Sequence, residues 1–181
     1  GNGGMIYYNA LSDLASVTVA GSEFRNATSV KDGGSIYLEA GKIESLDVSA
    51  SLFSSSVATV LSGGALFVKT DNGLIDAEFT ANRFLNCSSG LMGGSVYIED
   101  SKYDNANEQI NWTSNIYRRI DQDIVPETGG AVYCKGINAV RFESDSSISQ
   151  ASADKGGFLY LEKVYRAAYE SLYTYGNTSG T

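Results

Sequence analysis

The sequence predicts an all-β chain that winds as a right-handed parallel β-helix, and three observations lead to this fold class. A motif of Gly-Gly, any residue, an aliphatic residue and an aromatic residue occurs six times, with its first glycine at positions 3, 33, 63, 93, 129 and 156. After each motif, side chains of two kinds alternate with the period of two that is typical of strands. No helical stretch is long enough to serve as the crossover of a conventional parallel sheet.

The spacing of the motif predicts the domain organisation. Successive first glycines lie 30, 30, 30, 36 and 27 residues apart, which indicates a solenoid. We expect a single domain over 1–181 with about six coils that begin near these glycines, and a rod roughly 30 Å long because strands stack about 4.8 Å apart. The six additional residues of the fourth coil predict a loop insertion within 100–128. A propeller is less economical, because about 30 residues do not accommodate four strands per blade.

The first strand of each coil has two chemically different faces. One face is almost entirely aliphatic, as in Ile36/Leu38 and Val96/Ile98, and predicts the core. The other face carries an aromatic stripe and, two residues later, a charged column, and we expect this face outside. The stripe comprises Tyr7, Tyr37, Phe67, Tyr97, Tyr133 and Tyr160, and the charged column comprises Asn9, Glu39, Lys69, Glu99, Lys135 and Glu162. One interpretation is that the stripe and the charged column both keep neighbouring coils in register. The other is that the stripe binds carbohydrate or another protein.

Two further strands complete each coil. The second is indicated by the runs 17–19, 46–48, 75–79 and 140–142, and the third ends near Phe24, Phe53 and Phe84. Each coil therefore supplies about three short strands. The segment 163–175 is interpreted as another coil and not as a helix, because it lies between a Gly-Gly strand and the signal Tyr175-Gly176-Asn177. By the earlier spacing the next Gly-Gly is due at 184, and neither end resembles a cap, so we expect a larger protein.

Composition and charge limit the function classes. The chain has 13 basic and 21 acidic residues and a net charge of −8, which argues against nucleic acid or an anionic membrane as the partner. No apolar run approaches the roughly 18 residues that span a bilayer, so we expect no membrane insertion by this segment. The absence of histidine excludes imidazole-based triads and metal sites within the chain. We expect Cys87 and Cys134 to be free, buried thiols, and we expect no cofactor and no metal.

Four Asn-x-Ser/Thr sequons are glycosylation candidates: Asn26, Asn86, Asn111 and Asn177. Asn26, Asn86 and Asn177 share one corner of the coil, where an inward amide would instead bond backbone groups of neighbouring coils as a ladder. Both interpretations stay open. Asn111, next to the single Trp112, is the strongest candidate for a glycan.

Charged residues suggest two possible sites. Polysaccharide lyases and hydrolases on β-helices use carboxylates from neighbouring coils, and the outward column of the second strand is expected to contain Thr18, Asp47, Asp76 or Glu78, Asn111 and Arg141. The catalytic alternative therefore rests on Asp47, Asp76 and Glu78, although the preferred interpretation of these residues is an acidic, solvated surface. In the insertion, Arg118, Arg119, Asp121 and Asp123 form either a contact loop or an ordinary solvated loop. An ice-binding solenoid is disfavoured because no Thr-x-Thr ladder follows the coils.

Two short motifs resemble a known family. Gly-Gly-Ala-aliphatic at 63–66 and 129–132, with Phe-x-x-Asn at 79–82, resembles the polymorphic outer-membrane protein repeat of surface adhesins, a β-helix of the pectate-lyase-like kind. The resemblance implies a β-helix at a cell surface, often as an adhesin or autotransporter passenger. We therefore expect a non-enzymatic, extracellular or cell-surface rod module that serves adhesion, a filament or a coat. Protein partners or self-assembly are expected, and carbohydrate is a possible ligand.

Overall fold

A computed structural model of the chain confirms the predicted fold class. It describes residues 1–10, 12–102, 108–119, 124–148, 152–153, 155–175 and 178–179, and no helix occurs among them. Parallel sheets stack as a β-solenoid of about five turns with about 30 residues per turn. The expectation of about six coils counted rows of strands. The six Gly-Gly motifs enclose five intervals of one turn each, and the last row of strands continues past the sixth motif.

The first sheet contains the strand that follows each Gly-Gly motif. Its six parallel strands are β1 (Ile6–Asn9), β5 (Ile36–Ala40), β9 (Leu66–Thr70), β13 (Val96–Asp100), β16 (Val132–Lys135) and β20 (Leu159–Glu162), in this order. The register aligns the six motifs, so that Tyr37 lies opposite Phe67 and Glu39 opposite Lys69. Alignment of identical motif positions is what a fixed repeat length requires.

The second sheet also has six parallel strands. They are β2 (Leu14–Ala20), β6 (Ile43–Ser49), β10 (Leu74–Thr80), β14 (Gln109–Thr113), β17 (Ala139–Glu143) and β21 (Arg166–Glu170). Each contains one of the predicted second-strand runs or its equivalent in the register. The strand β21 confirms that the segment after Lys163 forms another coil.

A third sheet closes the coil. Its strands are β3 (Glu23–Arg25), β7 (Leu52–Ser54), β11 (Arg83–Leu85), β15 (Ile116–Arg118), β18 (Ser146–Ile148) and β22 (Tyr173–Tyr175). Several coils add a fourth, two-residue strand that the sequence did not predict: β4 (Thr28–Ser29), β8 (Val57–Ala58), β12 (Ser88–Ser89), β19 (Ser152–Ala153) and β23 (Thr178–Ser179). These strands are too short to produce a recognisable alternation in the sequence.

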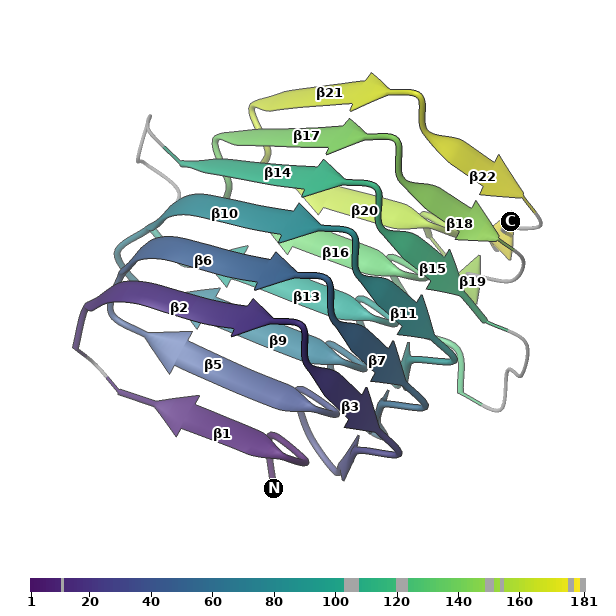
Figure 1. Cartoon of the computed structure of the whole chain (residues 1–181), viewed down its shortest axis with the longest axis horizontal. Coiled ribbons are helices and arrows are strands. Elements are labelled where there is room, and N and C mark those ends of the chain that lie inside the picture. The colour runs from purple at the N-terminus through teal and green to yellow at the C-terminus, as the bar shows by residue number, and fades with distance from the viewer. Residues whose placement is uncertain are drawn as a thin grey trace.

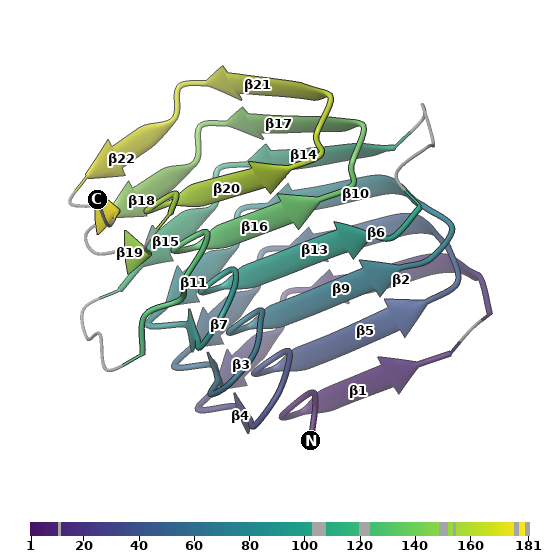
Figure 2. The ribbon, with the colours of Figure 1, turned by 180° about the vertical axis from the view of Figure 1, so that it is seen from behind.

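The path of the chain is right-handed. In Figure 1 the second sheet faces the viewer and its strands run left to right, while the strands of the first sheet return behind it and the rows climb from β2 to β21. Figure 2 shows the same rise from the opposite side, with the first sheet in front. Right-handed crossovers are the general rule for parallel strands.

Glycine is required at the two positions of each motif for two different steric reasons. At the corner before β9, Gly63 has φ +67°, a left-handed conformation that costs glycine nothing. A Cβ on the next residue, Gly64, would overlap the carbonyl oxygen of Gly94 in the following coil. The motif therefore combines a turn requirement with close stacking of neighbouring coils.

The interior contains one continuous apolar core with columns of stacked rings. Phe24, Phe53, Phe84 and Tyr117 stack with centroid distances of 4.9, 5.0 and 5.0 Å. A second column places the Trp112 ring 4.0 Å from Phe79 and 5.5 Å from Phe142. The predicted aliphatic face of the first strand is buried in the inner rows, which confirms that face as core.

Candidate interaction surfaces

The aromatic stripe is buried, so its predicted position on the outside is wrong for the inner rows. Tyr37, Phe67, Tyr97 and Tyr133 form a second small apolar cluster and are 1 to 7% exposed, against 58% for Tyr7 in the first row. Adjacent rings stack with centroids 4.8 to 5.6 Å apart. Each inner ring is covered by rings above and below, and Met92 from a corner segment packs against the cluster. The stripe is therefore a packing element in its inner rows.

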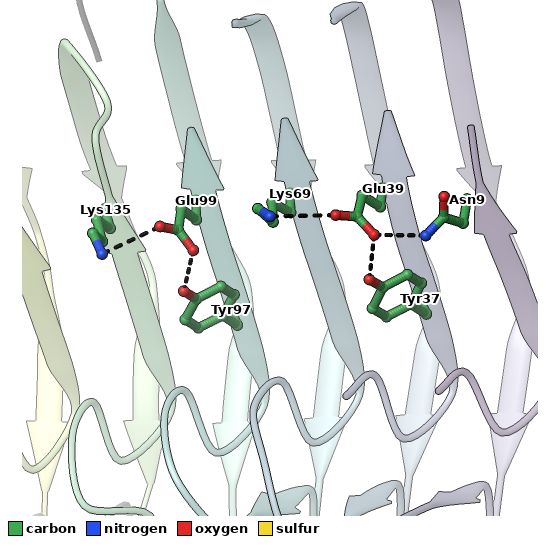
Figure 3. Close-up of polar contacts among 7 residues, drawn as sticks. All are labelled: Asn9, Tyr37, Glu39, Lys69, Tyr97, Glu99 and Lys135. Carbon is green, nitrogen blue, oxygen red and sulfur yellow. Dashed lines mark hydrogen bonds and ion pairs between the residues drawn. The ribbon is translucent and has the colours of Figure 1, made fainter. Parts of the chain in front are cut away.

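Beside the stripe, the charged column alternates in sign as the sequence predicts. Figure 3 shows Lys69 directed at Glu39 and Lys135 directed at Glu99, each on the neighbouring strand. The Nζ–Oε1 distances are 3.3 Å and 3.2 Å. Glu39 also accepts a 2.7 Å hydrogen bond from Asn9 Nδ2. These contacts join successive coils through their side chains as well as through the backbone.

Tyrosines of the stripe donate to glutamates of the charged column. The Tyr37 hydroxyl lies 2.5 Å from Glu39 Oε2, and the Tyr97 hydroxyl lies 2.6 Å from Glu99 Oε2 (Figure 3). Tyr133 instead reaches the next coil and donates to Glu162 Oε2 at 2.6 Å. Burial, followed by these hydrogen bonds to carboxylates, raises the pKa of all three phenols. All three therefore stay protonated hydrogen-bond donors near neutral pH.

The three carboxylates of the catalytic alternative lie on the open face of the second sheet. Glu78 pairs with Asp47 in one column of the register, whereas Asp76 pairs with Ser45 in the neighbouring column. The structure therefore selects Glu78, not Asp76, as the neighbour of Asp47. Glu78 Oε1 accepts a 2.8 Å hydrogen bond from Asn111 Nδ2. Adjacent rows place these side chains about 4.8 Å apart along the rod.

The sequons occupy different environments. Asn111 lies on β14 with its side chain on the outer face of the sheet, where Gln109 also donates to it at 2.8 Å. Asn26 is exposed at a left-handed corner with φ 55°, and Asn86 occupies an equivalent corner with φ 53° and is half-buried. Of the two interpretations left open for this corner, the inward ladder does not apply to Asn26, because its side chain is exposed to solvent. Asn177 lies outside the described residues.

A polar ladder does exist, but at the preceding corner. Asn82 Oδ1 accepts from the Ser51 backbone N–H, Asn115 Oδ1 accepts from the Asn82 backbone N–H, and Asp145 Oδ1 accepts from the Asn115 backbone N–H, at 2.8 to 3.0 Å. All four side chains are fully buried or nearly so. The sequence signal was available: Phe79, Trp112 and Phe142 each precede the ladder residue by three positions. The motif Phe-x-x-Asn is one instance of this wider pattern.

Asp145 departs from the pattern of the ladder. The Asn82 and Asn115 amides each donate Nδ2 to a carbonyl of the previous coil, Val48 and Phe79 respectively. In the register the next carbonyl in that series belongs to Trp112, but a carboxylate has no proton to donate to it. Asp145 Oδ2 has no hydrogen-bond partner among the described residues. Burial raises the pKa of Asp145 to about 6.

The predicted contact loop is described only in part. Arg118, at the end of β15, is exposed, whereas Arg119 is 4% exposed and lies beside Cys87 and Tyr117 at a cavity of about 10 Å³. Arg119 is therefore an interior residue and not part of a solvated loop. Asp121 and Asp123 lie outside the described residues.

The remaining chemical predictions concern cysteines, metals and membranes. Cys87 and Cys134 are buried and unpaired, as expected, and burial raises the pKa of both thiols, that of Cys87 to about 12. In the described part of the chain, no group of three or more Cys, Asp or Glu side chains is placed to hold a metal ion. None of the described residues forms a helix long and apolar enough to cross a bilayer.

Comparisons with known proteins add no family. Neither a protein-family model, a curated protein nor a solved structure matches the chain.

Proposed function

We propose that the chain is a non-enzymatic structural and interaction module of a larger extracellular or cell-surface protein. Its mechanism is to extend as a stiff rod and to present side chains at fixed spacings. In this function the rod serves adhesion, a filament or a coat, and its partners are proteins or other copies of itself, with carbohydrate as a further possible ligand. Sugar on one or more of the sequons fits the same setting.

The observation that carries this proposal is the continuity of three side-chain columns through successive coils. The aromatic stripe runs through all six rows, the charged column joins neighbours beside it, and the polar ladder joins Ser51 to Asp145. Each column bonds a coil to its neighbours, and a solenoid is stabilised by such nearest-neighbour contacts. The aromatic, charged and buried polar residues that recur in the sequence therefore mainly bind one coil to the next.

We also propose, from the motifs, a relationship to the polymorphic outer-membrane protein repeats of surface adhesins within the pectate-lyase-like β-helices. The support is that each motif residue has a physical task here. Gly63 and Gly64 permit the corner and the close stacking of coils, and the Asn82 side chain hydrogen-bonds both the preceding and the following coil. A surface location is part of this proposal.

A carbohydrate-active β-helix enzyme is the second candidate, and one observation favours it. Asp47 and Glu78 are neighbours in one outward column, with Asp76 beside them, so three carboxylates face the same solvent region. The variants Asp47→Asn and Glu78→Gln test it on a panel of acidic polysaccharides. The rod function predicts no product from the parent chain, whereas an enzyme would release product and lose that activity in either variant.

The rod function is tested on the native protein in its source cells. We expect a chain much longer than this 19.3 kDa segment, removed from intact cells by added protease, and glycopeptide mapping would report whether Asn111 carries sugar. Full protection of the chain in intact cells, together with its release only after lysis, would contradict a surface role.

A further inference from the structure

No other described strand crosses the outward face of the second sheet (Figure 1). Its side chains form three columns along the rod. The first column is Ser16, Ser45, Asp76, Gln109, Ala139 and Arg166; the second is Thr18, Asp47, Glu78, Asn111, Arg141 and Ala168; the third is Ala20, Ser49, Thr80, Thr113, Glu143 and Glu170. We call this surface the β2–β21 face.

Charge is distributed unevenly along this face. In the first two columns the acids Asp47, Asp76 and Glu78 lie on β6 and β10, and the bases Arg141 and Arg166 lie on β17 and β21. The uncharged side chains of β14 separate the two groups. Arg141 also contacts Glu143 at 3.2 Å and Glu170 at 3.0 Å, but exposed ion pairs of this kind are weak and can be shared with an incoming carboxylate.

The half of the face formed by β17 and β21 carries Arg141 and Arg166 in its first two columns and Glu143 and Glu170 in the third, and it is hollowed. Ala139 and Ala168 have short side chains between longer ones, and they leave an open depression of about 260 Å³ beside Gln109, Arg141 and Arg166. The acidic half carries longer side chains at the matching positions of its columns. The half with β17 and β21 thus has a depression and two arginines, and the half with β6 and β10 has projecting acidic side chains that could enter such a depression.

We propose that the β2–β21 face docks onto the same face of a second copy, with the two rods running in opposite directions. The two-fold axis lies parallel to the strands and passes through β14, so that β10 faces β17 and β6 faces β21 of the second copy. An isologous contact of this type closes as a dimer. This inference does not depend on the proposed surface role, because it uses only the chemistry of the face.

The symmetry brings complementary residues together. Glu78 lies opposite Arg141 of the second copy, and Asp76 and Asp47 lie opposite Ala139 and Ala168, in the hollow beside Arg166 of that copy. In the third column Glu143 faces Thr80 and Glu170 faces Ser49, so no carboxylates meet. On the axis itself Gln109, Asn111 and Thr113 face their own counterparts, and amides and hydroxyls can both donate and accept.

Charge excludes the other face-to-face arrangement. With the two-fold axis along the rod, each row would meet itself, which places Asp47 opposite Asp47, Glu78 opposite Glu78 and Arg141 opposite Arg141. Like charges placed opposite one another across an interface are destabilising. The opposed orientation of the two rods therefore follows from the positions of Asp47, Glu78 and Arg141 in the second column.

The size of the face sets the expected strength. With the axis through β14, the five strands β6 to β21 overlap and β2 does not; five strands about 4.8 Å apart and five residues of about 3.3 Å each give roughly 400 Å² per copy. The total of roughly 800 Å² is smaller than the usual specific interface, so only a weak, transient and salt-sensitive dimer is expected.

The test is sedimentation equilibrium of the 181-residue chain over a range of concentrations at low and high salt. We expect a monomer–dimer equilibrium at low salt that shifts to monomer at high salt. Glu78→Lys and Arg141→Glu should each weaken the dimer roughly tenfold or more, and the double variant should restore it. Because β14 separates these residues within one chain, restoration identifies a contact between copies. Arg83→Glu, an exposed reversal on β11, is the matched control and should change nothing.

A second measurement fixes the orientation. Both native cysteines are buried, so Gln109→Cys introduces one accessible thiol on the proposed axis, and a short bis-maleimide should link two copies through it. Arg83→Cys should not be linked. A chain that stays monomeric at all concentrations, or a dimer that Glu78→Lys and Arg141→Glu leave unchanged, would overturn the proposal. Growth beyond a dimer without Gln109→Cys linkage would show end-to-end association in its place.

Discussion

At the scale of single residues, Asp145 is the position where the chain departs from its own pattern. The ladder places an amide donor at this position in two earlier coils, but Asp145 supplies an acceptor, and its Oδ2 is buried without a partner among the described residues. A protonated carboxyl would restore the missing donor, and burial raises the pKa of Asp145 from 3.8 to about 6 in the direction that favours this state.

The effect on stability has a definite sign. The folded chain binds the Asp145 proton more tightly than the unfolded chain, so the free energy of unfolding falls as pH rises from about 4 to about 6. Asp145→Asn supplies a permanent donor and should raise the free energy of unfolding above pH 6 by roughly 1 to 3 kcal/mol. The difference from the parent chain should vanish near pH 4.

Urea unfolding followed by the fluorescence of the single, buried Trp112 at several pH values measures this difference. Asp145→Ala is the control, because it removes the acceptor of the Asn115 donors and should destabilise the chain at every pH. A constant difference between the Asn variant and the parent chain from pH 4 to pH 8 would show that Asp145 does not titrate as described.

At the scale of elements, the first sheet is bound together by side chains that alternate along the rod. Lys69 lies between Glu39 and Glu99 in the register, and its Nζ is 3.3 Å from Glu39 Oε1. The adjacent phenols of Tyr37 and Tyr97 donate to the same glutamates. The strand register of the first sheet is therefore stabilised by the alternating signs of the charged column as well as by the stacked aromatic rings.

Lys69→Glu places three carboxylates in successive rows and should lower the free energy of unfolding by about 1 kcal/mol at low salt, because like charges directly opposite repel. Added salt should recover much of this loss, since these side chains are partly exposed. Lys69→Gln is the matched control and should lose less stability with little salt dependence. Equal losses in both variants, independent of salt, would assign the effect to packing alone. Thermal or urea unfolding at two ionic strengths measures it.

At the scale of the whole molecule, burial increases from the ends of the rod toward its middle. The equivalent residues Ile6, Ile36 and Leu66 are 44%, 4% and 1% exposed, and all five residues of β21 are exposed. A solenoid coil is stabilised by its two neighbours, so coils with one neighbour have fewer contacts to lose on opening.

Hydrogen exchange of the 181-residue chain should therefore be slowest in the amides of β9 and β13 and fastest in those of β1 and β21. We expect protection to decline in steps from coil to coil toward both ends, because each coil contacts only its neighbours. Uniform protection in all six rows would indicate that the rod opens as one cooperative unit.

The sequence by itself determined the coil, the three long sheets and the alignment of the first strands. These features are local: Gly63 and Gly64 define a corner, and Leu66 and Val68 define an inward face, within a few residues of chain. Because the motif recurs, the same corner and the same inward face form in every row.

Tertiary structure decided which surfaces remain open and which polar groups meet. Tyr37 lies outside the main core, yet it is buried in a second apolar cluster between the stacked rings of Tyr7 and Phe67. Asn82, Asn115 and Asp145 become neighbours only when residues about 30 positions apart are stacked, and Glu78 rather than Asp76 joins Asp47 because of the strand register. These outcomes depend on contacts between coils, and a pattern read along one coil contains no information about what the next coil places against it.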